Sequence, residues 1–341
     1  MNIVFRVDSS LSMGAGHIMR CLTLADELTK QKHQVAFICR DLIGNLISSI
    51  EYSVLKLPRN SDFKSDDLYL NWLGETLEKD AEQTSKVIPD NTDVLIIDSY
   101  ALDIRWHKYL RKDTEKIMVI DDLANRQFDC DILLNQNLGV QKKNYNNKVS
   151  SDCRLLLGCN YALLRPEFAE FRNQALKKRK NTKEIKNILV SVGGSDTKNL
   201  TYDILQCLDG LDGFDIVVVL GETSPYNNMI KSYAKDRNVE VVINTNNMAE
   251  LMLDADLAIG AGGSTSWERC CLGLPTLLYI TADNQRKIAV ELELLSTVTI
   301  VKNLKNDLQV MINNFSLWQS MSDKAKNICD GNGVVNTIKL I

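Results

Sequence analysis

Short apolar runs alternate with stretches of helical periodicity along the first half of the chain. The expected strands cover residues 3–7, 35–39, 54–57, 93–98, 116–122, 131–134 and 154–157. Residues 66–86 have the leucine spacing of a helix. Several of these strands are continuously apolar, which is typical of strands buried on both faces of a parallel sheet. The runs that end at Asp98 and Asp122 therefore place acids at carboxyl ends of strands, where open α/β sheets bind ligands.

The second half of the chain repeats this rhythm. The expected strands there cover residues 187–192, 214–220, 239–243, 256–260 and 276–280. Glycine-rich turns at residues 193–196 and 260–268 each follow a strand and open a helix. Two successive α/β halves predict two Rossmann-like parallel-sheet domains that face each other across a cleft.

A charged segment separates the two halves. Residues 166–186 read as a helix plus linker, with four basic residues at 177–180. A basic run of this kind is either a solvated connector or a phosphate or nucleic-acid patch, and the acidic balance of the whole chain favours the connector. We expect an N-terminal domain at residues 1–165, a linker at 166–186 and a C-terminal domain at 187–341.

Composition narrows the class of protein. The 341 residues are 45% hydrophobic and 25% charged, with a net charge of −4, which fits a folded protein of two domains without the basic footprint of a nucleic-acid binder. No apolar run approaches the roughly 18 residues of a membrane helix, so we expect a cytoplasmic protein without stable membrane insertion. The nine cysteines are scattered without a C-x-x-C pair, and we expect neither a disulfide framework nor a metal site.

The first strand runs into Gly14-Ala-Gly16-His17, at the start of a helix with apolar residues at helical spacing. Glycines and unpaired N–H groups at such a junction suit an anionic ligand, whereas the alternative is an ordinary tight turn with a surface histidine. An imidazole exchanges protons near neutral pH, so His17 is the candidate acid/base. The two other histidines, His33 and His107, have the positions of surface or structural residues.

The strongest local signal is Gly260-Ala-Gly262-Gly263-Ser264-Thr265-Ser-Trp-Glu268. It begins like the dinucleotide fingerprint G-x-G-x-x-G, but Thr265 occupies the third glycine position, which disfavours a nicotinamide enzyme. The glycines, with the helix N-terminus that follows, suit a diphosphate, and Glu268 is placed to accept from ribose hydroxyls. The alternative is a glycine-rich turn with a capping serine.

Taken together, the motifs resemble a known family. They are Arg6-x-Asp8 with Gly14-x-Gly16-His17-x-x-Arg20, Ile120-Asp-Asp-Leu-Ala124, Leu157-Gly-x-x-Tyr-Ala-Leu-Leu-Arg165-Pro-Glu-Phe168, Ser191-Val-Gly-Gly-Ser-Asp196 and Gly262-Gly-Ser-x-x-x-Glu268. They are similar to the UDP-2,4-diacetamido-2,4,6-trideoxy-β-L-altropyranose hydrolases of pseudaminic acid biosynthesis. This family is related to the lipid-II-forming glycosyltransferase, and the resemblance implies GT-B architecture. It also implies metal-independent hydrolysis of a UDP-sugar, with no cofactor. Attack of water from the face of the sugar opposite to UDP would then predict inversion at the anomeric carbon.

The resemblance assigns roles to residues of this chain. It implies that His17 is catalytic and that the sugar is bound by Arg6, Asp8, Gly14, Gly16, Arg20, Asp98, Tyr100, Asn284 and Gln285. It implies that UDP is bound by Gly193, Gly194, Ser195, Gly262, Gly263, Ser264, Thr265 and Glu268. Residues 304–341 are helical in pattern, and in GT-B proteins a final helix often returns to the first domain.

Three functions remain open at this point. The histidine loop favours a UDP-sugar hydrolase. A glycosyltransferase of the same architecture, acting in surface or spore-coat polysaccharide synthesis, would use the same UDP site with an acceptor. A non-catalytic nucleotide-sugar binding module would bind UDP and release nothing. In each case the partner is a small molecule, and we expect a monomer or a weak oligomer.

Overall fold

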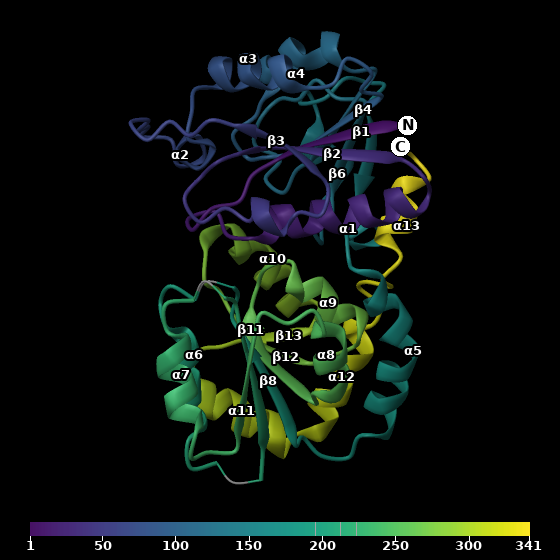
Figure 1. Cartoon of the computed structure of the whole chain (residues 1–341). Helices are drawn as coiled ribbons and strands as arrows, with labels where there is room; N and C mark the ends of the chain where they lie inside the picture. Colours follow the sequence, from purple (N-terminus) through teal and green to yellow (C-terminus); the bar gives the residue numbers. More distant parts are fainter. Residues whose placement is uncertain (195, 212, 223) are drawn as a thin grey trace. The chain divides into compact units, whose positions relative to one another are not determined.

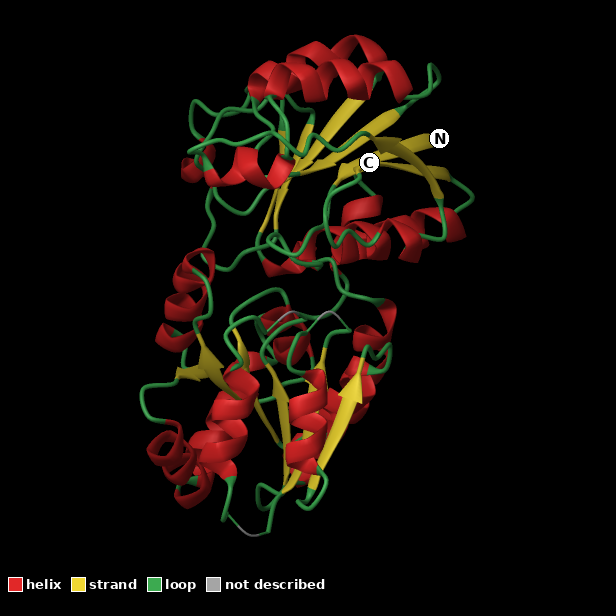
Figure 2. Cartoon of the chain, turned by 60° about the vertical axis from the view of Figure 1, so that its left-hand side comes forward, coloured by secondary structure: helices red, strands yellow, loops and turns green. Residues whose placement is uncertain are grey.

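A computed structural model describes residues 1–194, 196–211, 213–222 and 224–341. The chain divides into two compact units (Figure 1): unit 1 is Met1–Leu163 with Asn332–Ile341, and unit 2 is Leu164–Gly331. Each unit holds one parallel sheet covered by helices, as the strands and helices of Figure 2 show. The expected α/β class with two parallel sheets is confirmed.

The sheet of unit 1 has seven strands in the order β3-β2-β1-β4-β5-β6-β7. The strands are β1 (Asn2–Val7), β2 (Gln34–Arg40), β3 (Ser53–Leu57), β4 (Val94–Asp98), β5 (Lys116–Ile120), β6 (Ile132–Asn135) and β7 (Arg154–Leu157). The strand order reverses between β1 and β4, where Val7 pairs with Asp98. In open α/β sheets, ligands bind outside the carboxyl ends of the strands at such a reversal.

Two hydrophobic cores hold the helices of unit 1 on the two faces of the sheet. One core includes α1 (Gly16–Lys30) and α13 (Gly333–Ile338), and the other includes α3 (Leu77–Val87) and α4 (Ile104–Leu110). The single helix expected at residues 66–86 is wrong, because Gly74 adopts φ = 71° and ends α2 (Leu68–Leu73) before α3 begins. Short 3₁₀ turns lie at Ile47–Ser49, Arg111–Asp113, Lys142–Tyr145 and Cys159–Tyr161.

The sheet of unit 2 has six strands in the order β10-β9-β8-β11-β12-β13. The strands are β8 (Asn187–Ser191), β9 (Asp215–Leu220), β10 (Val239–Ile243), β11 (Leu257–Ala261), β12 (Thr276–Tyr279) and β13 (Val298–Ile300). Here the order reverses between β8 and β11, and each of these two strands runs into one of the glycine turns. The helices are α5 (Pro166–Asn181), α6 (Leu200–Leu208), α7 (Asn227–Ala234), α8 (Met248–Asp254), α9 (Thr265–Cys271), α10 (Asp283–Leu294), α11 (Leu304–Asn313) and α12 (Phe315–Ala325).

Residues 166–186, expected as a helix plus linker, contain helix α5, which belongs to unit 2 and packs on α8 and α9. Arg179 is 3% exposed and donates to the carbonyls of Met252 and Ala255 at the end of α8, and Lys178 donates to the carbonyl of Asp254. These two residues of the basic run therefore donate to carbonyl groups at the end of α8, where the helix dipole is negative.

Residues beyond Gly331 leave unit 2. Val334 and Ile338 of α13 join the core that contains Ile18 and Cys21 of α1. The final helix is thus part of unit 1, whereas α11 and α12 belong to unit 2. Across the described ranges given above, none of the helices has both the length and the apolar character that a bilayer crossing requires.

Candidate active site

His17 lies on the first turn of α1, at the reversal of the unit 1 sheet. Its Nδ1 is 2.6 Å from Oδ1 of Asp98, the last residue of β4, and the histidine is 8% exposed. Because α1 follows β1 and β1 pairs directly with β4, the fold brings together two residues that are 81 positions apart in the sequence. The structure thus gives the candidate acid/base a buried carboxylate partner.

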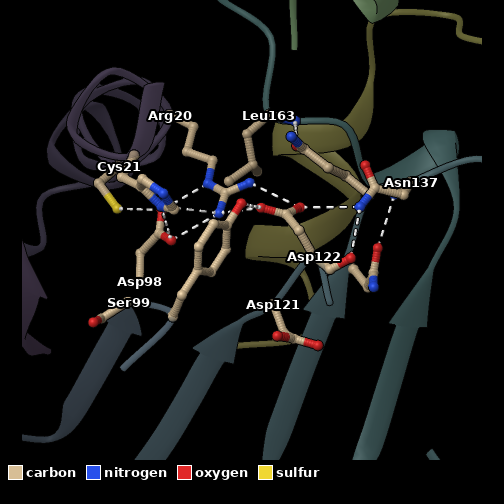
Figure 3. Close-up of polar contacts among 12 residues, drawn as sticks. Arg20, Cys21, Asp98, Ser99, Asp121, Asp122, Asn137 and Leu163 are labelled. Atoms are coloured by element: carbon tan, nitrogen blue, oxygen red, sulfur yellow. Dashed lines mark hydrogen bonds and ion pairs between the residues drawn. The ribbon is translucent and has the colours of Figure 1, made fainter. Parts of the chain in front are cut away.

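Arg20, one helical turn after His17, binds the same carboxylate. Its Nε and Nη2 lie 2.6 Å and 2.7 Å from the two oxygens of Asp98, and Nη2 is 3.3 Å from Nδ1 of His17. Burial opposes ionisation of Asp98, but Arg20 and His17 outweigh it and hold the pKa of this carboxyl well below its ordinary value. Asp98 is therefore an anion, and its contact with Nδ1 orients the imidazole. Figure 3 shows Asp98 beside Arg20.

Tyr100 and Asp122 extend this group. The Tyr100 hydroxyl donates to Oδ2 of Asp122 at 2.7 Å, and its ring meets the imidazole of His17 edge-on with 4.6 Å between centroids. Asp122 also forms an ion pair with Arg20 at 2.8 Å. Asp122 was not among the predicted site residues, although its place after a buried strand is the same signal that marked Asp98.

Arg6 is placed differently from the expectation. Its side chain is fully buried, and it pairs with Asp8 at 2.7 Å and with Asp80 of α3 at 2.6 Å. Asp80 also accepts from Arg40 and from the indole of Trp106. Arg6 has no exposed surface that could contact a sugar in this structure. Its guanidinium is buried and pairs with the carboxylates of this cluster, because a buried cation requires buried counter-charges.

Asp8, at the carboxyl end of β1, is only 2% exposed. Its Oδ1 accepts from the backbone N–H of Arg40 at 2.6 Å, and its Oδ2 has no hydrogen-bond partner. The loop that follows is open: a Cβ added at Gly14 or at Gly16 would meet no atom within 4 Å. Gly14 also adopts φ = 80°, which favours glycine. The loop therefore leaves space beside His17.

In unit 2, the first glycine turn follows β8. Gly193 has φ = 113°, and an added Cβ at either Gly193 or Gly194 would meet nothing within 4 Å. The backbone of Gly194 lies against Gly221, where an added Cβ would come within 2.0 Å of the Gly194 carbonyl oxygen. This close approach fixes the backbone of the turn on the side of Gly221, whereas the space next to the Cα atoms of Gly193 and Gly194 stays open. Ser195, also expected to bind UDP, lies outside the described residues.

The second glycine turn follows β11 and opens α9. Gly262 and Gly263 face Gln285 of α10, whose Nε2 is 3.9 Å from a Cβ built at Gly263. The side chain of Ser264 is exposed and makes no capping hydrogen bond, so the interpretation of this serine as a helix cap is wrong. Thr265 accepts from Arg269 at 3.2 Å. The structure thus brings Gln285 to the glycine turn, and Asn284, its neighbour in α10, is exposed.

Glu268 lies one turn into α9. The residue as a whole is partly exposed, but its Oε2 is buried and has no hydrogen-bond partner. Burial raises the pKa of Glu268 to about 7, against the lowering effect of Arg165 and Arg269. A buried carboxylate oxygen without a donor is costly, so it is a site where a ligand hydroxyl would be stabilising.

The other two histidines have no place in the site. His33 is partly exposed and its Nδ1 lies 3.3 Å from the amino group of Met1. His107 is fully buried, accepts from the N–H of Asp129 and stacks on Phe128, and burial lowers its pKa to about 3. Both match the surface or structural positions expected for them. Among the residues that the structure describes, no group of three His, Cys, Asp or Glu side chains is arranged to hold a metal ion.

Comparisons with known proteins agree with this fold. The glycosyltransferase family 28 C-terminal domain matches residues 187–324. A crystal structure of MurG from Acinetobacter baumannii superposes with a TM-score of 0.68 at 14% identity, covering 100% of this chain and 99% of that one, which confirms the GT-B-like fold class.

Several relatives match most of the chain. An uncharacterized protein of Methanocaldococcus jannaschii is 33% identical over 84% of this chain, which spans 57% of the length of that relative. The UDP-2,4-diacetamido-2,4,6-trideoxy-β-L-altropyranose hydrolase of Campylobacter jejuni is 30% identical over 77% of this chain and 86% of its own length. The chain therefore belongs to the family of UDP-2,4-diacetamido-2,4,6-trideoxy-β-L-altropyranose hydrolases.

Proposed function

We propose that this protein hydrolyses a UDP-linked diacetamido-trideoxy sugar in the synthesis of pseudaminic acid or a related surface glycan. In this reaction water attacks the anomeric carbon and UDP leaves. The observation that carries the proposal is the contact of 2.6 Å between His17 Nδ1 and Asp98, which gives a histidine beside an open glycine loop the partner that a general base needs.

His17 acts as the base through its second ring nitrogen. When Nδ1–H donates to the ionised Asp98, the lone pair of Nε2 is free to accept a proton from water. The imidazolium that forms is then stabilised by the same carboxylate. Asp8, Gly14 and Gly16 border the space in which the sugar and the water would lie, and Arg20 and Tyr100 hold the histidine in place.

Unit 2 binds the UDP part of the substrate in this proposal. The exposed N–H groups of the glycine turns meet the diphosphate, so negative charge that develops on the leaving UDP is stabilised by fixed dipoles. The free Oε2 of Glu268 accepts from the ribose. Gln285, which faces the second turn, and its neighbour Asn284 are assigned to the sugar in this proposal. Gly193, Gly194, Gly262, Gly263, Ser264 and Thr265 complete the proposed UDP site.

The stereochemistry follows from the direction of attack. Water that is deprotonated on the face of the sugar opposite to UDP displaces it in one step, as in inverting glycosidases. The free sugar is therefore expected to have the inverted anomeric configuration when it is first released, which NMR of the product would detect before mutarotation.

The test incubates the protein with the UDP-linked diacetamido-trideoxy sugar and measures the UDP and the free sugar that are released. A chelator is present because the proposed reaction needs no metal ion. His17→Ala should lower turnover by about 10²–10⁴-fold, the usual contribution of a general base, while the Kd for UDP stays within about twofold. Equal activity of this variant would contradict the role of His17.

The match to a glycosyltransferase domain favours a second candidate, transfer of the sugar to an acceptor. A transferase would release UDP at a substantial rate only after an acceptor is supplied. Release of free sugar without acceptor supports the hydrolase, and UDP binding without release under any condition would indicate a non-catalytic binding module.

A further inference from the structure

Two consecutive aspartates follow β5, and they have different environments. Asp121 is fully buried and binds the hydroxyl of Tyr145 at 2.7 Å and the guanidinium of Arg126 at 3.0 Å. The side chain of Asp122 is 15% exposed and reaches the group around His17 (Figure 3). The first aspartate thus anchors the loop within the fold, and the second is available to the site.

Asp122 pairs with one cation and accepts hydrogen bonds from two neutral side chains. Its oxygens lie 3.1 Å and 2.8 Å from Nη1 and Nη2 of Arg20, and they accept from Tyr100 at 2.7 Å and from Asn137 at 3.2 Å. Burial opposes ionisation of Asp122, but Arg20 lowers its pKa below the ordinary value. Asp122 is therefore a second anion within this group.

Arg20 is consequently held between two carboxylates. Asp98 takes Nε and Nη2 on one side, and Asp122 takes Nη1 and Nη2 on the other, as Figure 3 shows. With its planar fork used in this way, the guanidinium has a fixed orientation. That orientation matters because Nη2 is only 3.3 Å from Nδ1 of His17.

We infer that Asp122 is a positioning residue for the base: through Arg20 and Tyr100 it fixes the imidazole of His17 and balances the positive charge beside it. This inference rests on the proposed function for its catalytic consequence. Without Asp122, Arg20 would keep only one of its two counter-charges, and the Tyr100 hydroxyl would lose its acceptor. The positive charge next to the imidazole would then disfavour the imidazolium form.

The charged and titratable groups around this imidazole come from three parts of unit 1. They are Arg20 and Cys21 on α1, Asp98 and Tyr100 at and after the end of β4, and Asp122 after β5. Of these, Asp98 and Asp122 are the anions and Arg20 is the cation. Replacing Asp122 by asparagine removes one negative charge from this set while keeping the shape of the side chain.

The first measurement compares UDP release at pH 7 by the intact protein and by Asp122→Asn. We expect kcat to fall by about 10–100-fold, the range seen when an outer partner that orients a functional group is lost, with KM and UDP affinity within about threefold. Asp26→Asn, an exposed carboxylate on the same helix, is the matched control and should change none of these quantities.

The second measurement does not depend on turnover. The chain has three histidines, so NMR can follow the ring signals of His17, assigned by their loss in His17→Ala. At a fixed pH, these ring signals should change position in Asp122→Asn, because Arg20 and Tyr100 beside the imidazole lose a partner, and they should stay in place in Asp26→Asn. Because this readout needs no substrate, it separates a failure of the inference from a failure of the proposed reaction.

A third variant separates charge from contact geometry and serves if Asp122→Asn does not fold. Asp122→Glu keeps the charge, so its kcat should lie between those of the natural protein and Asp122→Asn, and its His17 ring signals should stay near their natural positions. Natural kcat with unchanged His17 ring signals in folded Asp122→Asn, or equal losses of kcat in Asp122→Asn and Asp122→Glu, would overturn the inference.

Discussion

Oδ1 of Asp98 lies 2.6 Å from Nδ1 of His17, and the same oxygen lies 2.7 Å from Nη2 of Arg20. One carboxylate oxygen thus serves a candidate base and a permanent cation at once. Its other oxygen accepts from Nε of Arg20 at 2.6 Å. Because Asp98 contacts both side chains, a shift in the position of Arg20 also affects the position of His17.

Asp98→Asn should therefore impair catalysis more than binding. The amide cannot balance the charge of Arg20, and if its NH₂ group faces Nδ1, the imidazole takes the opposite tautomer. We expect kcat to fall by on the order of 10²-fold or more, with UDP affinity nearly unchanged because the proposed UDP site lies in unit 2. Steady-state kinetics and calorimetric titration with UDP measure the two effects. Asp26→Asn on α1 is the control, and retention of full kcat in Asp98→Asn would contradict the role.

Glu268 is expected to make UDP binding depend on pH. Because burial raises its pKa to about 7, the free protein holds this carboxyl partly protonated near neutrality. Ribose hydroxyls donate to the carboxylate form, so binding favours loss of that proton, and affinity should rise as the pH increases from about 6 to about 8. Titration calorimetry across this range measures the effect.

The matched variant for this prediction is Glu268→Gln. It should bind UDP about 10–100-fold more weakly at pH 8, as expected for loss of hydrogen bonds to a charged group, and its affinity should follow only the titration of UDP itself. The raised pKa also means that ionisation of Glu268 destabilises the fold as the pH rises from about 4 to about 7. The glutamine variant should consequently unfold at a higher temperature than the natural protein at pH 8. Identical pH profiles for the two proteins would exclude this role of Glu268.

The glycine turn after β8 allows a paired test of binding against stability. Gly194→Ala places a methyl group in open space, so folding should be unaffected while UDP affinity falls by on the order of tenfold or more. Gly221→Ala places the methyl 2.0 Å from the Gly194 carbonyl, so it should lower the unfolding temperature as well. Thermal unfolding with and without UDP distinguishes them. A destabilised Gly194→Ala protein with normal UDP affinity would contradict this account of the turn.

The returning helix α13 makes a prediction about unit 1. Val334 is 5% exposed and packs in the core with α1, whereas Val335 beside it is 43% exposed. Val334→Ala should lower the free energy of unfolding of unit 1 by about 1–3 kcal/mol, and Val335→Ala by less than about 0.5 kcal/mol. Denaturant unfolding measures both, and equal effects would show that α13 does not contribute to this core.

Much of the fold could be predicted because continuous apolar runs specify buried parallel strands directly. The position of His17 at a strand-to-helix junction followed from the same pattern, and parallel pairing of β1 with β4 then places Asp98 beside it. Asp122 carries the same strand-end signal as Asp98, but no pattern in the sequence shows that its side chain pairs with Arg20, 102 positions away. Arg6 was misplaced for a related reason: its buried partner Asp80 is 74 positions away, and only the fold reveals it.

The charged segment before β8 shows another limit. Lys178 and Arg179 look solvated in the sequence, yet they bind carbonyl groups at the end of α8. Hydrophobic periodicity predicts which face of a helix packs on a hydrophobic core. It does not predict that a helix is held in place by hydrogen bonds from the long side chains of basic residues.

The return of α13 to unit 1 affects the order in which the units can be completed during synthesis. Unit 2 is one continuous segment, Leu164–Gly331, so all of its residues have been made before α13 exists. Unit 1 starts first, but its core lacks Val334 and Ile338 until residues 332–341 have left the ribosome. The segment made later can therefore finish folding first, and the half that carries His17 is completed last.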